Sequence, residues 1–324
     1  MASLRYAVVT PVRDEAENLA RLAEALAGQD RLPEAWVVVD TGSSDGTMAT
    51  AATLRAKHPW ITVDAVPVSG GVMRGGPVVQ AFHAGLRALP RGWDVVAKID
   101  ADTTMEPDYF DRLLGEFERN DRLGIAGGIA YELEPDGMWR QRHSTGIGVW
   151  GASRAYRREC LEQILPLEER MGWDTLDLAS ASVRGWDVRV LPDLPFLHHR
   201  KEGSRESSRY RHWVSHGQAA HYMGYRPSYL LLRTAYRMFG DPSAVGIGVG
   251  YVASAFRREA QCQDRLVTDY LRGEQSLRRL PVRVRQARRG RTVLADDFAS
   301  ARSRQSFHRS STESTESTEK RVSG

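Results

Sequence analysis

Lysine is scarce in this sequence. It occurs at four of 324 positions, so arginine supplies nearly all of the positive charge, and the formal net charge is only +4. Nucleic-acid-binding domains usually carry a strongly basic surface. So small a net charge therefore argues against a nucleic-acid partner.

Cysteines and long apolar runs are also few. The two cysteines, Cys160 and Cys262, lie far apart and match no metal-ligand spacing, which favours a reducing compartment. The longest apolar stretch, residues 244–256, falls short of the roughly 20 residues that a spanning helix needs. The first residues have no charged segment followed by an apolar core. We therefore expect no secretory signal and a cytoplasmic location.

Residues 93–102 are the stretch around which the rest of the chain is organised. Residues 95–99 are apolar except for Lys98 and rich in β-branched side chains, which predicts a buried strand. Asp100 and Asp102 follow it, and alternation along a strand can point both to the same side. Open α/β sheets bind ligands at this end of a strand, where two carboxylates can hold a divalent cation. The alternative is that Asp100 and Asp102 lie in a solvated loop without a ligand. The neighbouring motifs distinguish between these two interpretations.

Strand and helix patterns alternate through the first hundred residues. Strands are expected at 6–10, 35–39, 61–66 and 95–99, with helices between them. This order predicts a mostly parallel, doubly wound α/β sheet. Its strand ends at Thr10, Asp40 and Asp100 would converge on one crevice. We expect Pro11 to end the first strand and Asp14 to cap the helix after it.

The later chain mixes further strands and helices. Helices are expected at 107–120, 156–165 and 173–185, and strands at 124–131, 147–152, 188–191 and 195–199. Beyond residue 205 the pattern becomes helical and rich in aromatic side chains and arginine. From about residue 287 the chain is polar and ends in a repeated Ser-Thr-Glu triplet, which cannot bury enough apolar surface to fold.

Four motifs in a fixed order resemble those of the family 2 glycosyltransferases. They are Pro-Val-Arg-Asp-Glu at 11–15, Val-Val-Val-Asp at 37–40 with Ser-Ser-Asp-Gly-Thr at 43–47, Arg-Gly-Gly at 74–76 leading to Ala81 and Gly85, and Asp-Ala-Asp at 100–102. The resemblance implies a GT-A fold and transfer of a sugar from a nucleoside diphosphate with inversion at the anomeric carbon. It also implies a catalytic domain at 1–205, with a nucleotide-sugar-binding half at 1–104 and an acceptor half at 105–205. A helical extension at 206–286 and a polar tail at 287–324 would follow.

The resemblance gives several residues a role in binding the donor. Asp40 matches the aspartate that meets the base, and a carboxylate accepts from the ring N–H that uracil and guanine offer. Its alternative role is to cap the following helix. Glu15 would lie near the base or ribose, or else act only as a first-turn glutamate favoured by the helix dipole. Arg74 would contact base or phosphate, or lie on the surface. The remaining donor-site residues are Pro11, Arg13, Gly75, Asp100, Ala101 and Arg200.

The resemblance also implies a metal site. Asp102 matches the aspartate that binds Mg²⁺ or Mn²⁺, and Asp100 matches the one that reaches the ribose hydroxyls. The cation would act as a Lewis acid on the departing diphosphate. A histidine after the last strand is a further ligand in many GT-A enzymes. We favour His198 for this position and leave His199 open; both could instead be solvent-exposed. Arg200 could pair with the diphosphate.

The other half of the site needs a base for an acceptor hydroxyl. Asp174 occupies the place of the family's acidic motif, although this chain has Trp-Asp where Glu-Asp is usual. Asp177, one turn on, is the rival. If Asp174 caps its helix, backbone N–H groups stabilise its anion and weaken it as a base. The transition state should resemble an oxocarbenium ion.

The combined prediction is a metal-dependent glycosyltransferase that uses a UDP- or GDP-sugar. Its acceptor would be a glycan or lipid-linked hydroxyl in cell-surface polysaccharide synthesis, or alternatively polyprenyl phosphate. Outside this class, a nucleotidyltransferase or a non-catalytic sugar-nucleotide-binding scaffold remain. The first usually needs a Gly-rich basic loop after the first strand, which residues 11–15 do not provide. The helical extension would either dock on the anionic inner face of the membrane or pack on the catalytic core.

Overall fold

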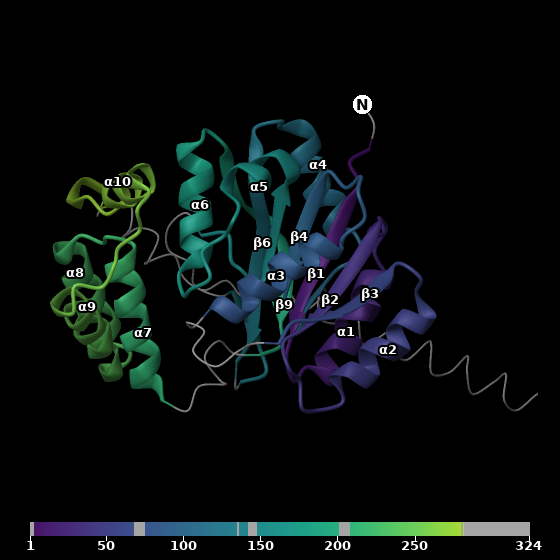
Figure 1. Cartoon of the computed structure of the whole chain (residues 1–324), viewed down its shortest axis with the longest axis horizontal. Helices are drawn as coiled ribbons and strands as arrows, with labels where there is room; N and C mark the ends of the chain where they lie inside the picture. The colour runs from purple at the N-terminus through teal and green to yellow at the C-terminus, as the bar shows by residue number, and fades with distance from the viewer. Residues whose placement is uncertain are drawn as a thin grey trace, which may run out of the picture.

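The computed structural model describes residues 3–67, 75–134, 136–141, 148–200, 208–279 and 281. Within these residues, a nine-stranded sheet forms the centre of the molecule and helices cover both of its faces (Figure 1). The strand order is β3-β2-β1-β4-β8-β6-β9-β5, and β7 pairs with β6. The predicted fold class, a mostly parallel α/β sheet with a C-terminal helical extension, is confirmed.

The parallel half of the sheet holds four strands whose carboxyl ends share one edge. They are β1 (Tyr6–Val12), β2 (Ala35–Asp40), β3 (Ile61–Ala65) and β4 (Val95–Ile99), with α1 (Ala16–Ala27), α2 (Thr47–Lys57) and α3 (Gly76–Ala88) between them. Helix α3 lies close to the sheet because Gly85 has no side chain. A Cβ added there would lie 2.3 Å from Cγ1 of Val9.

The second half of the sheet contains the antiparallel pairs. Its elements are β5 (Thr103–Met105), α4 (Tyr109–Arg119), β6 (Leu123–Leu133), β7 (Trp139–Gln141), β8 (Ser153–Arg157), α5 (Arg158–Ile164), α6 (Trp173–Val183) and β9 (Asp187–His198). β9 runs parallel to β6 and antiparallel to β5. The register places His198 opposite both Thr103 and Glu132, which brings the last strand beside the aspartate motif.

Several predicted boundaries were wrong. The strand expected at 147–152 lies at 153–157 as β8, and the helix expected from 156 begins at Arg158. The two strands expected at 188–191 and 195–199 form the single strand β9. β1 does not end at Pro11 but continues to Val12. Proline has no backbone N–H to donate, and β4, which pairs with β1 only as far as Val9, needs no hydrogen bond from this position.

The helix after β1 also begins differently from the prediction. Asp14 does not cap α1; its φ is +53° and Glu15 holds the N-cap position. The carboxylate of Asp14 instead accepts hydrogen bonds from the backbone N–H and the hydroxyl of Ser44, at 2.7 and 3.1 Å. The residue therefore ties the start of α1 to the loop after β2.

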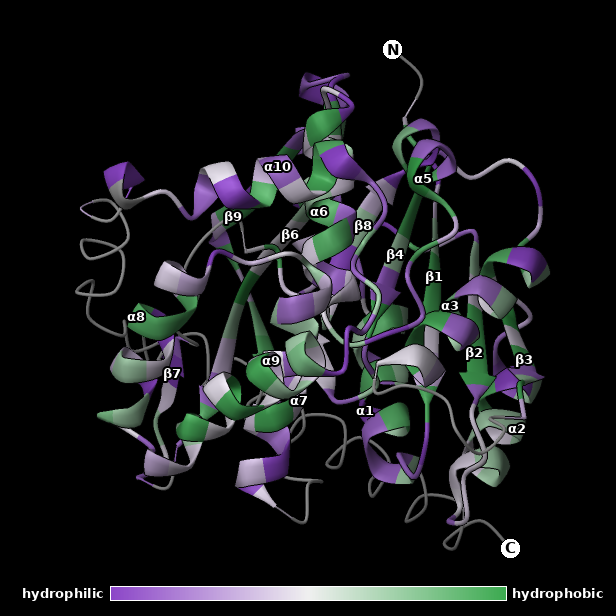
Figure 2. Cartoon of the chain, turned by 60° about the vertical axis from the view of Figure 1, so that its left-hand side comes forward, coloured by the Kyte–Doolittle hydropathy of each residue, from purple (hydrophilic) through white to green (hydrophobic). Residues whose placement is uncertain are grey.

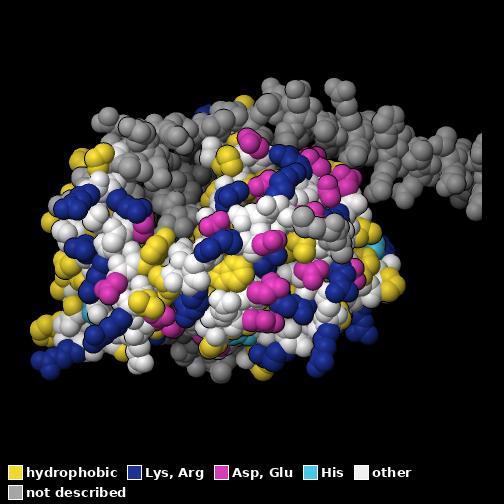
Figure 3. Space-filling model, turned by 90° about the horizontal axis from the view of Figure 1, so that it is seen from above, with side chains coloured by type: hydrophobic (Ala, Val, Ile, Leu, Met, Phe, Trp, Pro, Cys, Tyr) yellow, Lys and Arg dark blue, Asp and Glu magenta, His cyan; other side chains and the backbone are white. Residues whose placement is uncertain are grey.

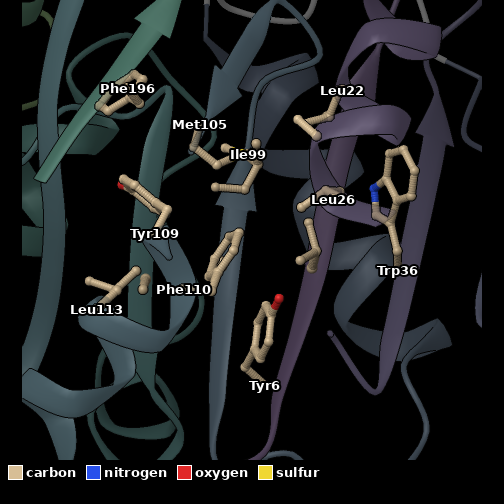
Figure 4. Packing of buried hydrophobic residues seen from close by; sticks show 14 of the residues in the cluster. Tyr6, Leu22, Leu26, Trp36, Ile99, Met105, Tyr109, Phe110, Leu113 and Phe196 are labelled. Atoms are coloured by element: carbon tan, nitrogen blue, oxygen red, sulfur yellow. The ribbon is translucent and has the colours of Figure 1, made fainter. Parts of the chain in front are cut away.

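Two apolar clusters hold helices to the two faces of the sheet. The first includes side chains from α1 and α4, and the second includes side chains from α3, α5 and α6. Figure 4 shows part of the first cluster, in which the rings of Tyr6 and Phe110 stack with centroids 4.5 Å apart. Tyr109 meets Phe110 edge to face at 5.3 Å.

The C-terminal helices form a separate layer beside the sheet, which we call the helical unit. It consists of α7 (Arg209–Tyr222), α8 (Pro227–Met238), α9 (Gly246–Phe256) and α10 (Arg265–Glu274) (Figure 1). Leu176 and Ala179 of α6 share an apolar cluster with side chains of α7 and α10. In the described part of the chain, no helix is both long and apolar enough to cross a membrane. The predicted polar tail lies outside the described residues.

Candidate active site

The aspartate motif forms a turn between β4 and β5. The backbone N–H and the hydroxyl of Thr103 both donate to the carbonyl of Asp100, at 3.2 and 2.8 Å. The two aspartates therefore do not follow strand alternation, and each carboxylate meets different partners. The Asp100 carboxylate accepts from the buried ammonium of Lys98, whereas Asp102 faces β9. Ala101, between them, is buried.

His198 lies between two carboxylates. Its Nε2 is 3.4 Å from Oδ1 of Asp102, and its Nδ1 is 3.3 Å from Oε1 of Glu132. Burial by itself lowers the pKa of His198, but hydrogen bonds and charge interaction with the carboxylates outweigh burial and raise that pKa to about 9. Burial raises the pKa of Asp102, yet His198 and the charge of Arg200 hold it below its usual value.

The neighbouring histidine points elsewhere. Nε2 of His199 lies 2.8 Å from the hydroxyl of Thr104, and its ring meets Trp139 edge to face at 5.4 Å. Its backbone N–H donates to the carbonyl of Asp102 at 2.8 Å. Consecutive side chains of a strand point to opposite faces, so one of the two histidines meets Asp102 and the other does not.

Arg200 closes the site from the end of β9. Its Nη1 and Nη2 donate to the two oxygens of Glu15, each at 2.6 Å, and Nη1 lies 4.0 Å from Oδ2 of Asp102. This bidentate pair joins the start of α1 to the end of β9 across 185 residues of sequence. Glu15 also accepts from the side-chain amide of Asn18 at 2.7 Å.

Asp40 ends β2 and organises the loop that follows it. Its carboxylate accepts from the backbone N–H of Gly42 at 3.1 Å and of Ser43 at 3.1–3.2 Å. The helix after this loop begins with Gly46 at the N-cap, so Asp40 does not cap α2. The loop contacts residues 14–16, because the Ser43 hydroxyl accepts from the backbone N–H of Asp14 at 3.0 Å. Pro11 lies at the end of β1 and Arg13 is exposed beside it.

Gly75 connects the two halves of the site. Its φ is +85°, and an added Cβ would lie 2.8 Å from the carbonyl oxygen of Arg170. Only glycine permits both this backbone conformation and the close approach to the segment that leads into α6. Arg74, which the resemblance also assigned to the donor site, lies outside the described residues.

Asp174 lies in the first turn of α6 with its carboxylate uncommitted. Gly172, with φ +89°, holds the N-cap position, and no side chain caps this helix. Within the described ranges, no group donates a hydrogen bond to the Asp174 side chain, which is partly exposed. A Cβ added to Gly151 would lie 3.7 Å from Cβ of Asp174, and the Gly151 carbonyl accepts from Lys98 at 2.7 Å. Lys98 and Gly151 therefore place Asp174 near Asp100.

Asp177, three residues on, is fully committed. Both of its oxygens lie 2.6 Å from Nη1 of Arg154, one oxygen accepts from the Tyr156 hydroxyl at 2.6 Å, and the other accepts from the backbone N–H of Leu178 at 2.6 Å. The side chains of Arg154 and Asp177 are each 1% exposed. Burial raises the pKa of Asp177, and the positive charge of Arg154 opposes this effect.

Carboxylate and imidazole groups suit Mg²⁺ or Mn²⁺. Asp102 and His198 supply one of each, 3.4 Å apart, and adjacent ligands of an octahedral ion at about 2.1 Å lie about 3.0 Å apart. Among the described residues, no three His, Cys, Asp or Glu side chains form a complete metal site. Asp102 and His198 would therefore fill two positions around such a cation, and other groups would have to supply the remaining ligands.

A family model for glycosyl transferase family 2 matches residues 7–173, more than half of the chain. The chain belongs to glycosyl transferase family 2. The matched segment includes the Asp102 turn and ends at Trp173, directly before Asp174. This result confirms the family that the four motifs predicted.

Two relatives are similar over part of this family 2 chain. The polyprenol monophosphomannose synthase of Mycolicibacterium smegmatis is 32% identical over 181 residues, covering 49% of this chain and 64% of that protein. The undecaprenyl-phosphate mannosyltransferase of Micrococcus luteus is 35% identical over 112 residues, covering 34% and 43%. The chain thus spans less than two thirds of the length of both relatives.

Solved structures share the fold. A mannosyltransferase from Pyrobaculum calidifontis, in complex with GDP-Man and Mn²⁺, superposes with a TM-score of 0.53 at 16% identity and covers 89% of this chain and 85% of its own. The S. aureus protein TarS, residues 1–349 with UDP-GlcNAc, gives 0.51 at 18% identity, covering 67% and 66%. At these identities the likeness shows a shared GT-A fold.

Sequence reasoning missed two residues of the site. Lys98 is 2% exposed in an otherwise apolar strand, and a lone lysine in such a run was the available signal. Glu132 lies near the end of β6 and had no comparable signal, because its contact with His198 crosses 66 residues of sequence. Both act on residues that the motifs had identified.

Proposed function

We propose that this chain transfers a sugar from a nucleoside-diphosphate sugar to a hydroxyl of a glycan or lipid-linked acceptor. The observation that carries the proposal is the pairing of Asp102 with His198 beside the parallel strand ends, together with the uncommitted carboxylate of Asp174. Family membership supports the same reaction class. We propose the domain boundaries on the same basis: donor half 1–104, acceptor half 105–205, helical extension 206–286 and tail 287–324.

The donor half would bind the nucleotide. Asp40 already accepts from the loop amides, and its carboxylate oxygens would accept one further hydrogen bond from a base N–H. Asp100 would contact the ribose hydroxyls. Pro11, Arg13 and Gly75 would shape the walls of the site. Arg200, now paired with Glu15, would exchange part of this contact for the diphosphate, because a guanidinium binds carboxylate and phosphate with the same planar geometry.

Asp102 and His198 would hold the divalent cation. When bound, the cation neutralises the charge that develops on the departing diphosphate. Glu132 would accept the Nδ1 proton of His198 and so present Nε2 to the metal, which is the usual arrangement behind a metal-bound histidine. His199 points to Thr104 and Trp139, so we do not propose it as a ligand.

Asp174 would act as the base. Its carboxylate makes no helix-capping hydrogen bond. It would therefore be able to take the acceptor's proton while the new C–O bond forms at the anomeric carbon. Displacement from the side opposite the diphosphate would invert that carbon. Asp177 is a poor candidate, because both oxygens are occupied and its side chain is 1% exposed.

The test is thermal unfolding of the protein with UDP, GDP, CDP or ADP, each with and without Mn²⁺. A nucleotide at a hundred times its Kd adds about 2.7 kcal/mol to the stability, which raises Tm by roughly 5 °C for a chain of this size. We expect a metal-dependent rise with UDP or GDP that Asp102→Ala abolishes. If none of the four nucleotides raises Tm, the proposed donor site is contradicted.

A second candidate acceptor is polyprenyl phosphate, which the names of both relatives favour. A phosphate monoester has a second pKa near 6, so it is mostly dianionic at neutral pH and needs no base. Incubation with labelled donor separates the candidates. Label that enters the organic phase only with added polyprenyl phosphate, and equally well with Asp174→Asn, would establish the phosphate acceptor and remove the base from the mechanism.

A further inference from the structure

Helix α9 exposes an apolar stripe that no described element covers. The stripe recurs every three or four residues, so its members lie on one face of the helix. Its members, with their exposed fractions, are Val245 (41%), Val249 (46%), Val252 (64%) and Phe256 (89%). Single exposed apolar residues are common on proteins, but a continuous stripe usually marks a binding surface.

Helix α8, which packs beside α9, repeats this arrangement. It buries Leu230 and Thr234 and exposes the opposite face. That face includes Leu231 (71%), Leu232 (44%), Tyr236 (56%) and, directly after the helix, Phe239 (92%). Figure 2 shows the apolar character of α8 and α9 as green segments at the side of the molecule away from β2 and β3.

The orientation of α9 is fixed by backbone contact. A Cβ added to Gly250 would lie 2.1 Å from the carbonyl oxygen of Val214, and one added to Gly217 would lie 2.0 Å from that of Ile247. Helices α7 and α9 can approach so closely only through these glycines. If α9 were rotated to bury its stripe, valine or phenylalanine side chains would lie where the glycines now contact α7. These side chains would clash with the backbone of α7, so the stripe faces outward.

Positive charge surrounds the two exposed faces. Residues 226–259 contain five arginines and two acidic residues, Asp241 and Glu259. Oε1 of Glu259 lies 3.7 Å from Nη1 of Arg257, and both side chains stay exposed to solvent. The Asp241 carboxylate is committed to the indole N–H of Trp213 at 2.8 Å and to the backbone N–H of Ser243 at 3.0 Å. Figure 3 shows this end of the molecule on the left, where basic side chains, with some acidic ones, lie between exposed apolar ones. The basic side chains of the helical unit are all arginines, because residues 208–279 contain no lysine.

We propose that the outward faces of α8 and α9 dock the protein on an anionic lipid membrane surface. Phe239 and Phe256, the most exposed apolar residues of the two faces, enter the boundary between headgroups and acyl chains, and the arginines contact lipid phosphates. The apolar face and basic border together match such a surface, whereas an uncharged protein partner would gain nothing from the excess of arginine. The docking is independent of the reaction proposed above.

The docked orientation would bring the acceptor half toward the membrane. Helices α7 and α10 of the helical unit share an apolar cluster with α6, whose first turn carries Asp174. Apolar packing therefore joins the helical unit to the helix that carries the proposed base.

The test is flotation of the full-length protein with vesicles, without donor or acceptor. Vesicles of equal parts phosphatidylglycerol and phosphatidylcholine should bind the protein, and pure phosphatidylcholine should bind it less. Phe239→Ser and Phe256→Ser should each lower the affinity about tenfold or more, because each withdraws a large apolar side chain from the lipid. Arg257→Gln should lower it about fivefold.

Leu32→Ser is the matched control, since Leu32 is 54% exposed but lies between α1 and β2 in the donor half. It should bind vesicles like the unmodified protein. An unchanged Tm and nucleotide response in the phenylalanine variants would exclude misfolding. Unimpaired flotation of the double phenylalanine variant would overturn the proposal. So would a lipid-free dimer that these substitutions dissociate, because a second copy would then cover the face.

Discussion

Two clusters of buried charge, one around Asp177 and one around Asp102, differ in how many of their polar groups the protein itself satisfies. Around Asp177, both oxygens have protein donors and the side chains of the ion pair are each 1% exposed. Around Asp102, the side chains are 7% exposed in His198, 11% in Asp102, 12% in Glu132 and 26% in Arg200. The first cluster is closed by the protein, whereas the second remains accessible at the strand ends.

We interpret the closed cluster as structural and the accessible cluster as functional. Removing one partner of a closed ion pair strands the other charge in a medium of low dielectric constant, so such a pair resists change. An accessible cluster can exchange a contact within the protein for one with a ligand. The same distinction applies to Asp174 and Asp177, which lie three residues apart on α6 and yet belong to different environments.

The largest expected effect comes from the accessible carboxylate of α6. With a hydroxyl acceptor, Asp174→Asn should lower kcat by about 10²–10⁴-fold, because the amide cannot take the acceptor's proton. Steady-state kinetics measure the loss. The nucleotide-induced rise in Tm should persist, since the proposed nucleotide site does not include Asp174. Full transfer to a hydroxyl acceptor by this variant would remove Asp174 as the base.

The next effect comes from the closed ion pair. Asp177→Asn should lower the free energy of unfolding by about 3–5 kcal/mol, because Arg154 would keep an uncompensated buried charge. Urea denaturation measures the change, with Asp174→Asn as a control that should stay within about 0.5 kcal/mol of the unmodified protein. A stable Asp177→Asn protein without turnover would reverse the two roles.

The smallest effect concerns the residue that orients His198. Glu132→Gln should weaken Mn²⁺ binding about tenfold, because the amide keeps a hydrogen-bond acceptor but loses the negative charge behind the imidazole. Electron paramagnetic resonance of free Mn²⁺, titrated in the presence of nucleotide, measures the affinity. His199→Ala is the control and should bind Mn²⁺ normally. Equal losses in both variants would indicate general disruption of β9.

Much of the donor half could be predicted from local pattern. The strands at β2 and β4 are short, β-branched and fully buried, so their composition alone identified them. The predictions failed at β8, where Arg154 and Arg157 make a buried strand look polar. These arginines are compatible with burial only because Asp177 and several backbone carbonyls receive their N–H groups. No local pattern could reveal those partners.

The sequence by itself determined the family, the order of strands and helices in the donor half, and the carboxylates that the motifs carry. The tertiary structure alone decided which histidine faces Asp102, which aspartate of α6 remains uncommitted, and that Glu15 pairs with Arg200. Each of these choices depends on strand register or on contacts across tens to hundreds of residues. Local composition cannot encode them, because a shift of one residue in a strand turns every side chain to the opposite face.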